Sequence, residues 1–162
     1  MNVQLILDLF AEAKHHLKYP KVRFTAGNHP VALSLAGERS AHPGDINVTD
    51  GGPYGDNTWY GRITTDGVWI KSRAVTPEIE SIVEHFAADP ARTASVYGLR
   101  FNHCCFCARE LTDPVSVEVG YGPVCADHFG LPHKIEDRWA GANAPHQYFR
   151  HHPNRRVLND QN

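Results

Sequence analysis

The stretch HCCFCARELTDPVSVEVGYGPVCADHFGL, residues 103–131, decides the fold of this chain because it holds all four cysteines of the sequence. Cys104 and Cys107 are separated by two residues, and after a gap of 17 residues Cys125 and His128 repeat that spacing. Two such pairs are typical of zinc sites, because a Cys-x2-Cys turn aims two thiolates at one point and the second pair does the same on the first turn of a helix. The sequence therefore predicts one Zn²⁺ ion held by Cys104, Cys107, Cys125 and His128.

The same stretch contains competing ligands. Cys105 is too close to Cys107 for the usual knuckle, so we expect it to be a small buried apolar residue. His103 competes with His128 for the fourth position, although it precedes the knuckle and has no partner at the right spacing. The structural alternative is four ordinary buried cysteines, which their clustering within 22 residues disfavours.

The predicted site is closed. Four protein ligands leave no open position for water or substrate, which is the arrangement of a structural zinc rather than a catalytic one. Asp127 lies between two ligands and is expected to point to solvent. The metal would then replace the core that a segment of about 30 residues cannot build alone.

The residues between the ligand pairs predict how the ligands are presented. The valines of residues 115–119 alternate with polar residues, as in a strand, and the glycines of residues 120–122 end that strand. Pro123 is suited to the first position of a short helix that carries the last two ligands. Knuckle, hairpin and helix in this order form a treble-clef zinc module, predicted over residues 99–133.

Composition and charge limit the remaining possibilities. The 162 residues are 41% hydrophobic, which suffices for one modest core. The net charge of −2 provides no global basic field for nucleic acid, and residues 102–133 hold one arginine against four acids. The sequence contains no run of about 18 apolar residues that could span a membrane. At the N-terminus, Asp8 and Glu12 interrupt the apolar stretch that a signal peptide requires. We expect a cytoplasmic protein, where clustered cysteines bind metal rather than form disulfides.

Upstream of the cysteines, residues 1–98 are predicted to form an α+β domain. Apolar residues at helical spacing predict an N-terminal helix over residues 2–17. Short alternating segments around Phe24, Leu33 and Val48 predict strands of a small, mainly antiparallel sheet.

Two helices and a tail complete the prediction. Thr76-Pro77 and Asp89-Pro90 each place an N-cap residue before a proline, which is typical of a helix start. Gly98 is the expected terminator of the second helix. Residues 134–162 are predicted to be a polar tail, with aromatic anchors at Trp139, Tyr148 and Phe149.

The strongest hairpin signal is TWYGRITTDGVWIKSR, residues 58–73. Asp66-Gly67 suits a two-residue type I′ turn, which pairs Ile63 with Ile70. On one face this register places aromatic rings beside cations, which suits single-stranded nucleic acid because bases stack and cations follow phosphates. The alternative is a solvated sheet face whose large side chains serve strand pairing. The candidate surface comprises Tyr60, Arg62, Trp69, Lys71 and Arg73, extended by the basic residues Lys14, Lys18, Lys21 and Arg23.

The cysteine stretch resembles the C-terminal zinc module of small, uncharacterised bacteriophage proteins. The likeness rests on the Cys-x2-Cys pair, on Leu-Thr-Asp at residues 111–113, and on Gly-Tyr-Gly-Pro-Val-Cys-Ala at residues 120–126. Residues 17–23 and 59–63 resemble the segments that precede this module more loosely. The resemblance implies a phage-encoded protein that acts inside a bacterial host, and it implies no activity.

From these observations we expect a non-catalytic accessory protein that binds a host or phage protein. The acidic zinc segment offers only Arg109 to phosphates, which disfavours a nucleic-acid finger. Binding of single-stranded DNA or RNA through the hairpin face is the alternative. A metal-dependent nuclease is a second alternative, because some nucleases share the treble-clef scaffold. It would need a histidine base and an open metal site, and the pairs at residues 15–16 and 151–152 lack supporting carboxylates in a motif.

Overall fold

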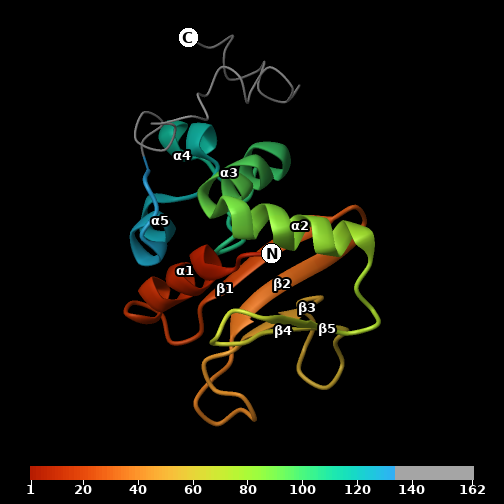
Figure 1. Cartoon of the computed structure of the whole chain (residues 1–162). Helices are drawn as coiled ribbons and strands as arrows, with labels where there is room; N and C mark the ends of the chain where they lie inside the picture. The colour runs from red at the N-terminus through yellow and green to blue at the C-terminus, as the bar shows by residue number, and fades with distance from the viewer. Residues whose placement is uncertain (134–162) are drawn as a thin grey trace.

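The computed structural model describes residues 1–133, which form an α+β fold built on one antiparallel sheet. The sheet has five strands in the order β1-β2-β3-β4-β5, so each strand pairs with its neighbour in sequence (Figure 1). This confirms the predicted fold class and the strands expected around Phe24, Leu33 and Val48. The strands are β1 (Lys21–Ala26), β2 (His29–Leu35), β3 (Ile46–Thr49), β4 (Trp59–Ile63) and β5 (Trp69–Lys71).

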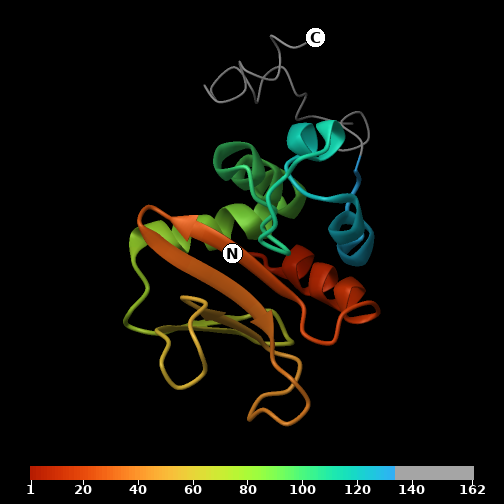
Figure 2. The ribbon, with the colours of Figure 1, turned by 180° about the vertical axis from the view of Figure 1, so that it is seen from behind.

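Five helices accompany the sheet within residues 1–133. In both views α3, α4 and α5 lie on the side of α1 and α2 that is remote from β3, β4 and β5 (Figures 1 and 2). No helix in this part of the chain combines the length and apolar character needed to cross a bilayer. The helices are α1 (Gln4–Lys14), α2 (Pro77–Ala88), α3 (Pro90–Phe101), α4 (Pro114–Val119) and α5 (Pro123–Phe129).

The core lies between the sheet and the first two helices. Val22 and Leu33 pair across β1 and β2 and are fully buried. Phe24 of β1 meets Phe86 of α2 edge to face, with ring centroids 5.0 Å apart. Full burial of such a side chain contributes about 1.5–3 kcal/mol, so the alternating pattern of the strands is sufficient to select this face.

The two predicted helix starts are confirmed. The Thr76 hydroxyl accepts a hydrogen bond from the Ile79 N–H at 3.3 Å, and an Asp89 carboxylate oxygen accepts one from the Arg92 N–H at 3.1 Å. In both helices the residue after the cap is proline, whose missing N–H costs nothing at that position. The expected end at Gly98 is wrong, because α3 continues to Phe101 and ends on Asn102 in the left-handed conformation.

The strand predicted over residues 115–119 is also wrong, because this segment is the helix α4. An Asp113 carboxylate oxygen accepts a hydrogen bond from the Ser116 N–H at 3.0 Å, and Pro114 occupies the first helical position. Burial follows a helical spacing, with Ser116 and Val119 buried and Val115 exposed. A helix therefore replaces the hairpin of the predicted treble-clef arrangement, because the cap signal overrides the alternation of valines.

The hairpin between β4 and β5 forms, but its predicted register is wrong by one residue. Ile63 pairs with Trp69 and Arg62 with Ile70. The Thr64 N–H donates to the Val68 carbonyl at 2.8 Å, so the connecting loop has three residues and ends on Gly67 with φ of +90°. This register buries the large indole of Trp69 and leaves Ile70 exposed, which places more apolar surface in the core.

The predicted tail and its anchors Trp139, Tyr148 and Phe149 lie outside the described residues.

The predicted domain boundary at residue 98 lies within a shared hydrophobic core. One cluster of buried side chains contains Val22 of the sheet and Phe10 of α1 together with Phe106 and Phe129 from the cysteine region. A change at the cysteine site is therefore expected to reach the sheet.

Candidate metal centre

The Cys-x2-Cys pair sits in a tight loop after α3. The Ala108 N–H donates to the Cys104 carbonyl at 2.8 Å, and the Cys104 N–H donates to the Arg109 carbonyl at 2.9 Å. Ala108 takes a positive φ of 62°, which an L-residue adopts only at some cost. A β-bridge between His103 and Glu110 closes the base of the loop. This geometry turns the two cysteine side chains towards the same side, as the spacing predicts.

The third clustered cysteine, Cys125, lies on α5. Gly122 is the N-cap of that helix, Pro123 is its first residue, and Cys125 follows within the first turn. The sulfur atoms of Cys104, Cys107 and Cys125 all lie within 4.8 Å of one another. In a tetrahedral zinc site with Zn–S bonds of about 2.3 Å, sulfur atoms are roughly 3.8 Å apart. The three thiols therefore fit a metal of this kind, with one ligand position remaining.

Electrostatics at the cluster favour a thiolate at Cys104. The pKa of Cys104 is lowered to about 5, mainly by the hydrogen bond from the Cys125 side chain, while burial opposes the shift. The same contact raises the pKa of Cys125, and burial raises it further. A buried thiolate surrounded by donors is the form in which cysteine binds metal. The remaining donors to the Cys104 sulfur are the backbone N–H groups of Gly122, Cys107 and Phe106.

The predicted fourth ligand, His128, lies on α5 and faces α1. Its ring stacks on that of His16, with ring centroids 5.2 Å apart and planes at 14°. The group of ligand atoms within 4.8 Å comprises the three thiols and does not include an imidazole nitrogen of His128. The competing His103 places Nδ1 2.8 Å from the Phe101 carbonyl oxygen. His128 thus stays a prediction as a ligand, and His16 is a neighbour that sequence spacing does not reveal.

Cys105 differs in kind from the three clustered cysteines. It is fully buried, and burial raises the pKa of its thiol well above the usual value. Its carbonyl accepts a hydrogen bond from the Arg23 N–H of β1 at 2.7 Å. The Arg23 guanidinium also donates from Nη1 to the Phe106 carbonyl at 3.1 Å. The knuckle is therefore bonded to the outer edge of β1, and Arg23 belongs to this junction rather than to a free basic surface.

Apolar contacts continue the junction from the knuckle to α1. Phe106 stacks on Phe129 of α5 with ring centroids 4.3 Å apart. Phe129 in turn meets Phe10 of α1 edge to face at 6.2 Å. These rings connect the cysteine cluster to the core of the sheet domain, so metal binding and packing of α1 are expected to be coupled.

The predicted hairpin surface is not assembled as expected. Tyr60 and Trp69 are 5% and 8% exposed, so neither ring is available to stack on a base. The Arg62 guanidinium lies 3.0 Å from the Asp45 carboxylate, and the Lys71 ammonium contacts the Glu80 carboxylate. For Trp69 the physical reason is the one-residue register change, which turns the indole into the core.

The basic residues of the predicted surface are placed separately. Lys14 and Lys18 line a hollow of about 860 Å³ between the end of α1 and the loop after β2, together with Tyr19 and Arg39. Lys21 is half-buried on β1, paired with Ser34 of β2. Arg73 is exposed beyond β5. The sequence thus identified two of the cations of this hollow but missed Arg39, which the loop between β2 and β3 brings to them.

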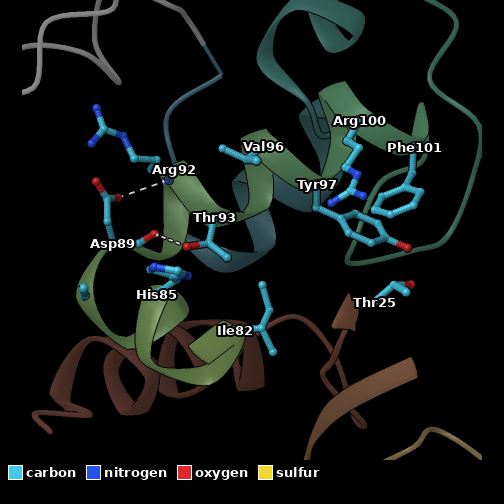
Figure 3. A pocket seen from close by; sticks show the side chains of 11 residues that line it. Thr25, Ile82, His85, Asp89, Arg92, Thr93, Val96, Tyr97, Arg100 and Phe101 are labelled. Carbon is cyan, nitrogen blue, oxygen red and sulfur yellow. Dashed lines mark hydrogen bonds between the residues drawn. The ribbon is translucent and has the colours of Figure 1, made fainter. Parts of the chain in front are cut away.

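A second hollow, of about 490 Å³, lies between α2 and α3 and was also missed (Figure 3). Its lining includes Tyr97, Arg100 and Phe101 near the end of α3. The available signal was the Arg100-Phe101 pair, whose members follow Tyr97 by three and four residues and so lie near it on one helix. The opposite wall comes from α2, and only the tertiary structure shows that the two walls meet.

The cysteine region matches a family model whose function is unknown. Residues 94–130 match the family DUF6011, and this segment contains the three clustered cysteines and His128. The match begins within α3 and ends at the C-cap of α5. Comparison with curated proteins and with solved structures finds no match for the chain.

Proposed function

We propose that this chain is a zinc-stabilised, non-catalytic accessory protein of a bacteriophage, which binds a host or phage protein in the bacterial cytoplasm. The observation that carries the proposal is the position of the three clustered thiols. They lie in a loop that is bonded to β1 through Arg23 and Cys105, and in a helix that packs on α1. A metal at this point fastens two parts of one core, which is a structural task.

One structural zinc ion, held by Cys104, Cys107, Cys125 and His128, is the form of the site that we propose. A bound zinc supplies a fixed positive charge and a rigid tetrahedral link between the knuckle and α5. The His128 ring stacks on that of His16 and lies outside the group of clustered ligand atoms, so the proposed ligand set requires the His128 side chain to move towards the thiols. Four protein ligands leave no place for a substrate, so we propose no catalytic role.

Metal analysis of the full chain tests the site. We expect one zinc per chain in the native protein and in Cys105→Ala, and loss of zinc in Cys107→Ser. The pair is matched because both residues are cysteines of the same knuckle and only one belongs to the cluster. Zinc retained in full by Cys107→Ser would contradict the ligand assignment.

The fourth ligand has its own test. We expect His128→Ala to lower zinc affinity in a competition with a chromophoric chelator, and His16→Ala to keep the metal with a small change in stability. The result would be inverted if His16 were the ligand. Equal zinc affinity in both variants and in the native chain would remove His128 and His16 from the ligand set.

The charge of the cysteine region supports a protein as the partner. Residues 102–133 hold one arginine against four acids, which does not suit phosphate contacts but suits a basic protein surface. We expect one stoichiometric, nuclease-resistant protein to co-purify with the tagged full chain from host lysate. A partner that is lost after nuclease treatment would contradict the proposal.

A second candidate function, binding of single-stranded DNA or RNA, is favoured by the hollow at the end of α1. Lys14, Lys18 and Arg39 line it with the exposed ring of Tyr19, against the single acid Glu38. Exposed aromatic and cationic side chains are the combination that single strands require. Salt-sensitive binding of a labelled oligonucleotide, lost in the double variant Lys14→Ala/Lys18→Ala and kept in Arg73→Ala, would support it. Binding that all variants retain would exclude this hollow.

A further inference from the structure

The hollow between the end of α1 and the loop after β2, which we call the α1–β2 hollow, has the size of a ligand site. Its volume of about 860 Å³ lies within the range of roughly 300–1,000 Å³ that is usual for small-molecule pockets. The end of α1 and the segment after it contribute Lys14, Lys18 and Tyr19. The loop after β2 contributes Arg39. Three cations and one aromatic ring therefore meet at one place, although they come from two segments that are remote in sequence.

The three cations of the α1–β2 hollow have no competing partner. Within residues 1–133, no ion pair or hydrogen bond joins the side chain of Lys14, Lys18 or Arg39 to another group. By contrast, Arg62 and Lys71 each face a carboxylate. An anion that enters the hollow thus meets cations without displacing a carboxylate from them.

Two groups oppose an anion in the α1–β2 hollow. Glu38 is the one acid among the described residues that line it. The C-terminal end of α1 adds about half a negative charge. Against them stand the three full positive charges of two lysines and one arginine, which stay protonated at neutral pH. The lining therefore keeps a surplus of positive charge.

Hydrogen bonds hold the loop that presents Arg39. The Gly44 N–H donates to the Ala36 carbonyl at 3.2 Å and closes the base of the loop. The Ser40 hydroxyl donates to the Gly37 carbonyl at 2.8 Å, across the turn that contains Arg39. A loop that is already closed loses less conformational entropy when it binds a ligand.

Tyr19 presents an aromatic ring to the same hollow. The residue is 69% exposed, and the Lys18 ammonium lies 5.4 Å from the centroid of its ring. A Cβ atom at Gly37 would lie 3.9 Å from Cε1 of Tyr19, so the ring lies beside the loop after β2. Most of the ring surface stays open, and an exposed ring next to cations is suited to stacking a planar base.

The positive surface does not continue from the hollow across the sheet. Arg23 donates to the Phe106 carbonyl, and Arg62 faces Asp45. A long strand needs cations along the path of its phosphates, whereas a single nucleotide needs a ring and several cations at one place. The α1–β2 hollow therefore fits the base and the phosphates of one nucleotide better than the backbone of a long strand.

We propose that the α1–β2 hollow binds one nucleotide that carries a chain of phosphates at its 5′ position. The phosphates contact Lys14, Lys18 and Arg39, and the base stacks on Tyr19. A free nucleoside triphosphate and the 5′-triphosphate end of a strand share this chemistry. Such a site goes beyond the proposed binding of a protein, and it rests on the same hollow as the second candidate function.

Calorimetric titration of the full chain with ATP, adenosine and inorganic tripolyphosphate tests the cations. We expect ATP to bind roughly tenfold or more tightly than either fragment, because adenosine lacks the phosphates and tripolyphosphate lacks the base. Arg39→Ala should weaken ATP binding roughly fivefold or more. The control Arg73→Ala removes an exposed arginine outside the hollow and should leave ATP binding within about twofold.

A variant of the ring separates nucleotide binding from general attraction of anions. We expect Tyr19→Ala to weaken ATP binding roughly fivefold or more and to leave tripolyphosphate binding within about twofold. Tyr54→Ala is the matched control, because Tyr54 is an exposed tyrosine outside the hollow. ATP that binds no better than tripolyphosphate, equal losses in Arg39→Ala and Arg73→Ala, or unchanged ATP binding in Tyr19→Ala would each overturn the proposal.

Two forms of a short oligo-dT with a 3′ label distinguish the sources of the nucleotide. Tighter binding of the 5′-triphosphate form than of the 5′-hydroxyl form, with displacement by ATP, would identify a strand end as the ligand. Binding of ATP that neither form displaces would identify a free nucleotide. Equal binding of both forms that ATP does not displace would overturn the proposal and leave the second candidate function standing. A host protein that co-purifies equally with the native chain and with Arg39→Ala would support the protein-binding function whichever nucleotide result is found.

Discussion

The two edges of the sheet are closed in different ways. At β1 the knuckle covers the edge, with the Arg23 N–H bonded to the Cys105 carbonyl and the Arg23 side chain bonded to Phe106. At β5 the edge strand has three residues, and the Lys71–Glu80 contact links it to α2. An uncovered edge invites pairing with other chains, and proteins prevent this with a cover or with a short, charged strand. Here one sheet uses both devices, and only the first lies beside the three clustered thiols.

The largest effect is expected from removing the zinc ion that we propose, because its loss would release the knuckle that covers β1. Zinc binding contributes about 10–16 kcal/mol in zinc-finger peptides, which is comparable to the whole stability of a domain. We expect chelation of the native chain to expose the backbone of residues 21–26 to hydrogen exchange before that of residues 46–49. Exchange measured by mass spectrometry on peptides from both strands compares the two.

The test depends on the difference in hydrogen exchange between β1 and β3. Residues 46–49 form β3 in the centre of the sheet, bonded on both sides, so they should exchange only after global unfolding. Protection of β1 that chelation leaves unchanged would mean that the thiols hold the knuckle without metal.

The next effect concerns the contact between α3 and the C-terminal end of α4. A Cβ atom at Gly98 would lie 1.7 Å from the Gly120 carbonyl oxygen, so α3 and the end of α4 touch through backbone. We expect Gly98→Ala to destabilise the chain by about 3 kcal/mol or more, because the clash is with backbone and cannot relax by side-chain rotation. The midpoint of urea unfolding measures this loss.

Gly122→Ala is the matched control for that substitution. Nothing lies within 4 Å of a Cβ at Gly122, and its φ of −79° suits any residue. We expect its unfolding midpoint to stay close to that of the native chain. A loss as large as that of Gly98→Ala would mean that the Gly98–Gly120 contact is not the cause.

These sites also show which features a sequence can predict. The Cys104–Cys107 spacing, the Thr76 cap and the Asp89 cap depend on a few neighbouring residues whose chemistry requires one local geometry. The sequence therefore predicted the three-thiol cluster and both helix starts, and the structure has them. The fold class followed in the same way, because strand alternation and helix caps are local.

The failures depend on contacts that are remote in sequence. The register of β5 follows from burial of Trp69 opposite Ile63, and local turn chemistry alone favoured another pairing. Gly98 did not end a helix because its missing side chain serves the approach of Gly120, which is 22 residues away. The hollow between α2 and α3 was not predicted because each helix supplies only one of its walls. The segment at residues 115–119 is the exception, since its cap at Asp113 was local and was outweighed by the valine alternation.

A smaller effect is expected at the Asp45–Arg62 pair, which lies nearer to the open edge. Asp45 Oδ2 is 3.0 Å from Arg62 Nε on β4, but the two groups lack the alignment of a hydrogen bond. Their side chains are 10% and 23% exposed, so part of the charge stays solvated. We expect Asp45→Asn to cost about 1 kcal/mol in urea unfolding. A loss of several kcal/mol would show that this pair contributes as much to the stability of the sheet as the knuckle that covers β1.

The smallest effect is expected at the open edge itself. The Lys71 ammonium contacts Glu80 and lies 5.2 Å from the Trp69 ring, and both partners of the ion pair are exposed. Exposed ion pairs contribute about 0–1 kcal/mol to stability, so Lys71→Ala should change the free energy of unfolding by no more than about 0.5 kcal/mol in moderate salt.

The Lys71→Ala substitution should have a larger effect on self-association, because the lysine also repels a second strand from β5. Light scattering at increasing protein concentration should therefore show more self-association for Lys71→Ala than for Arg73→Ala. If both variants stay monomeric, the short length of β5 is enough to protect this edge, and the charge is dispensable.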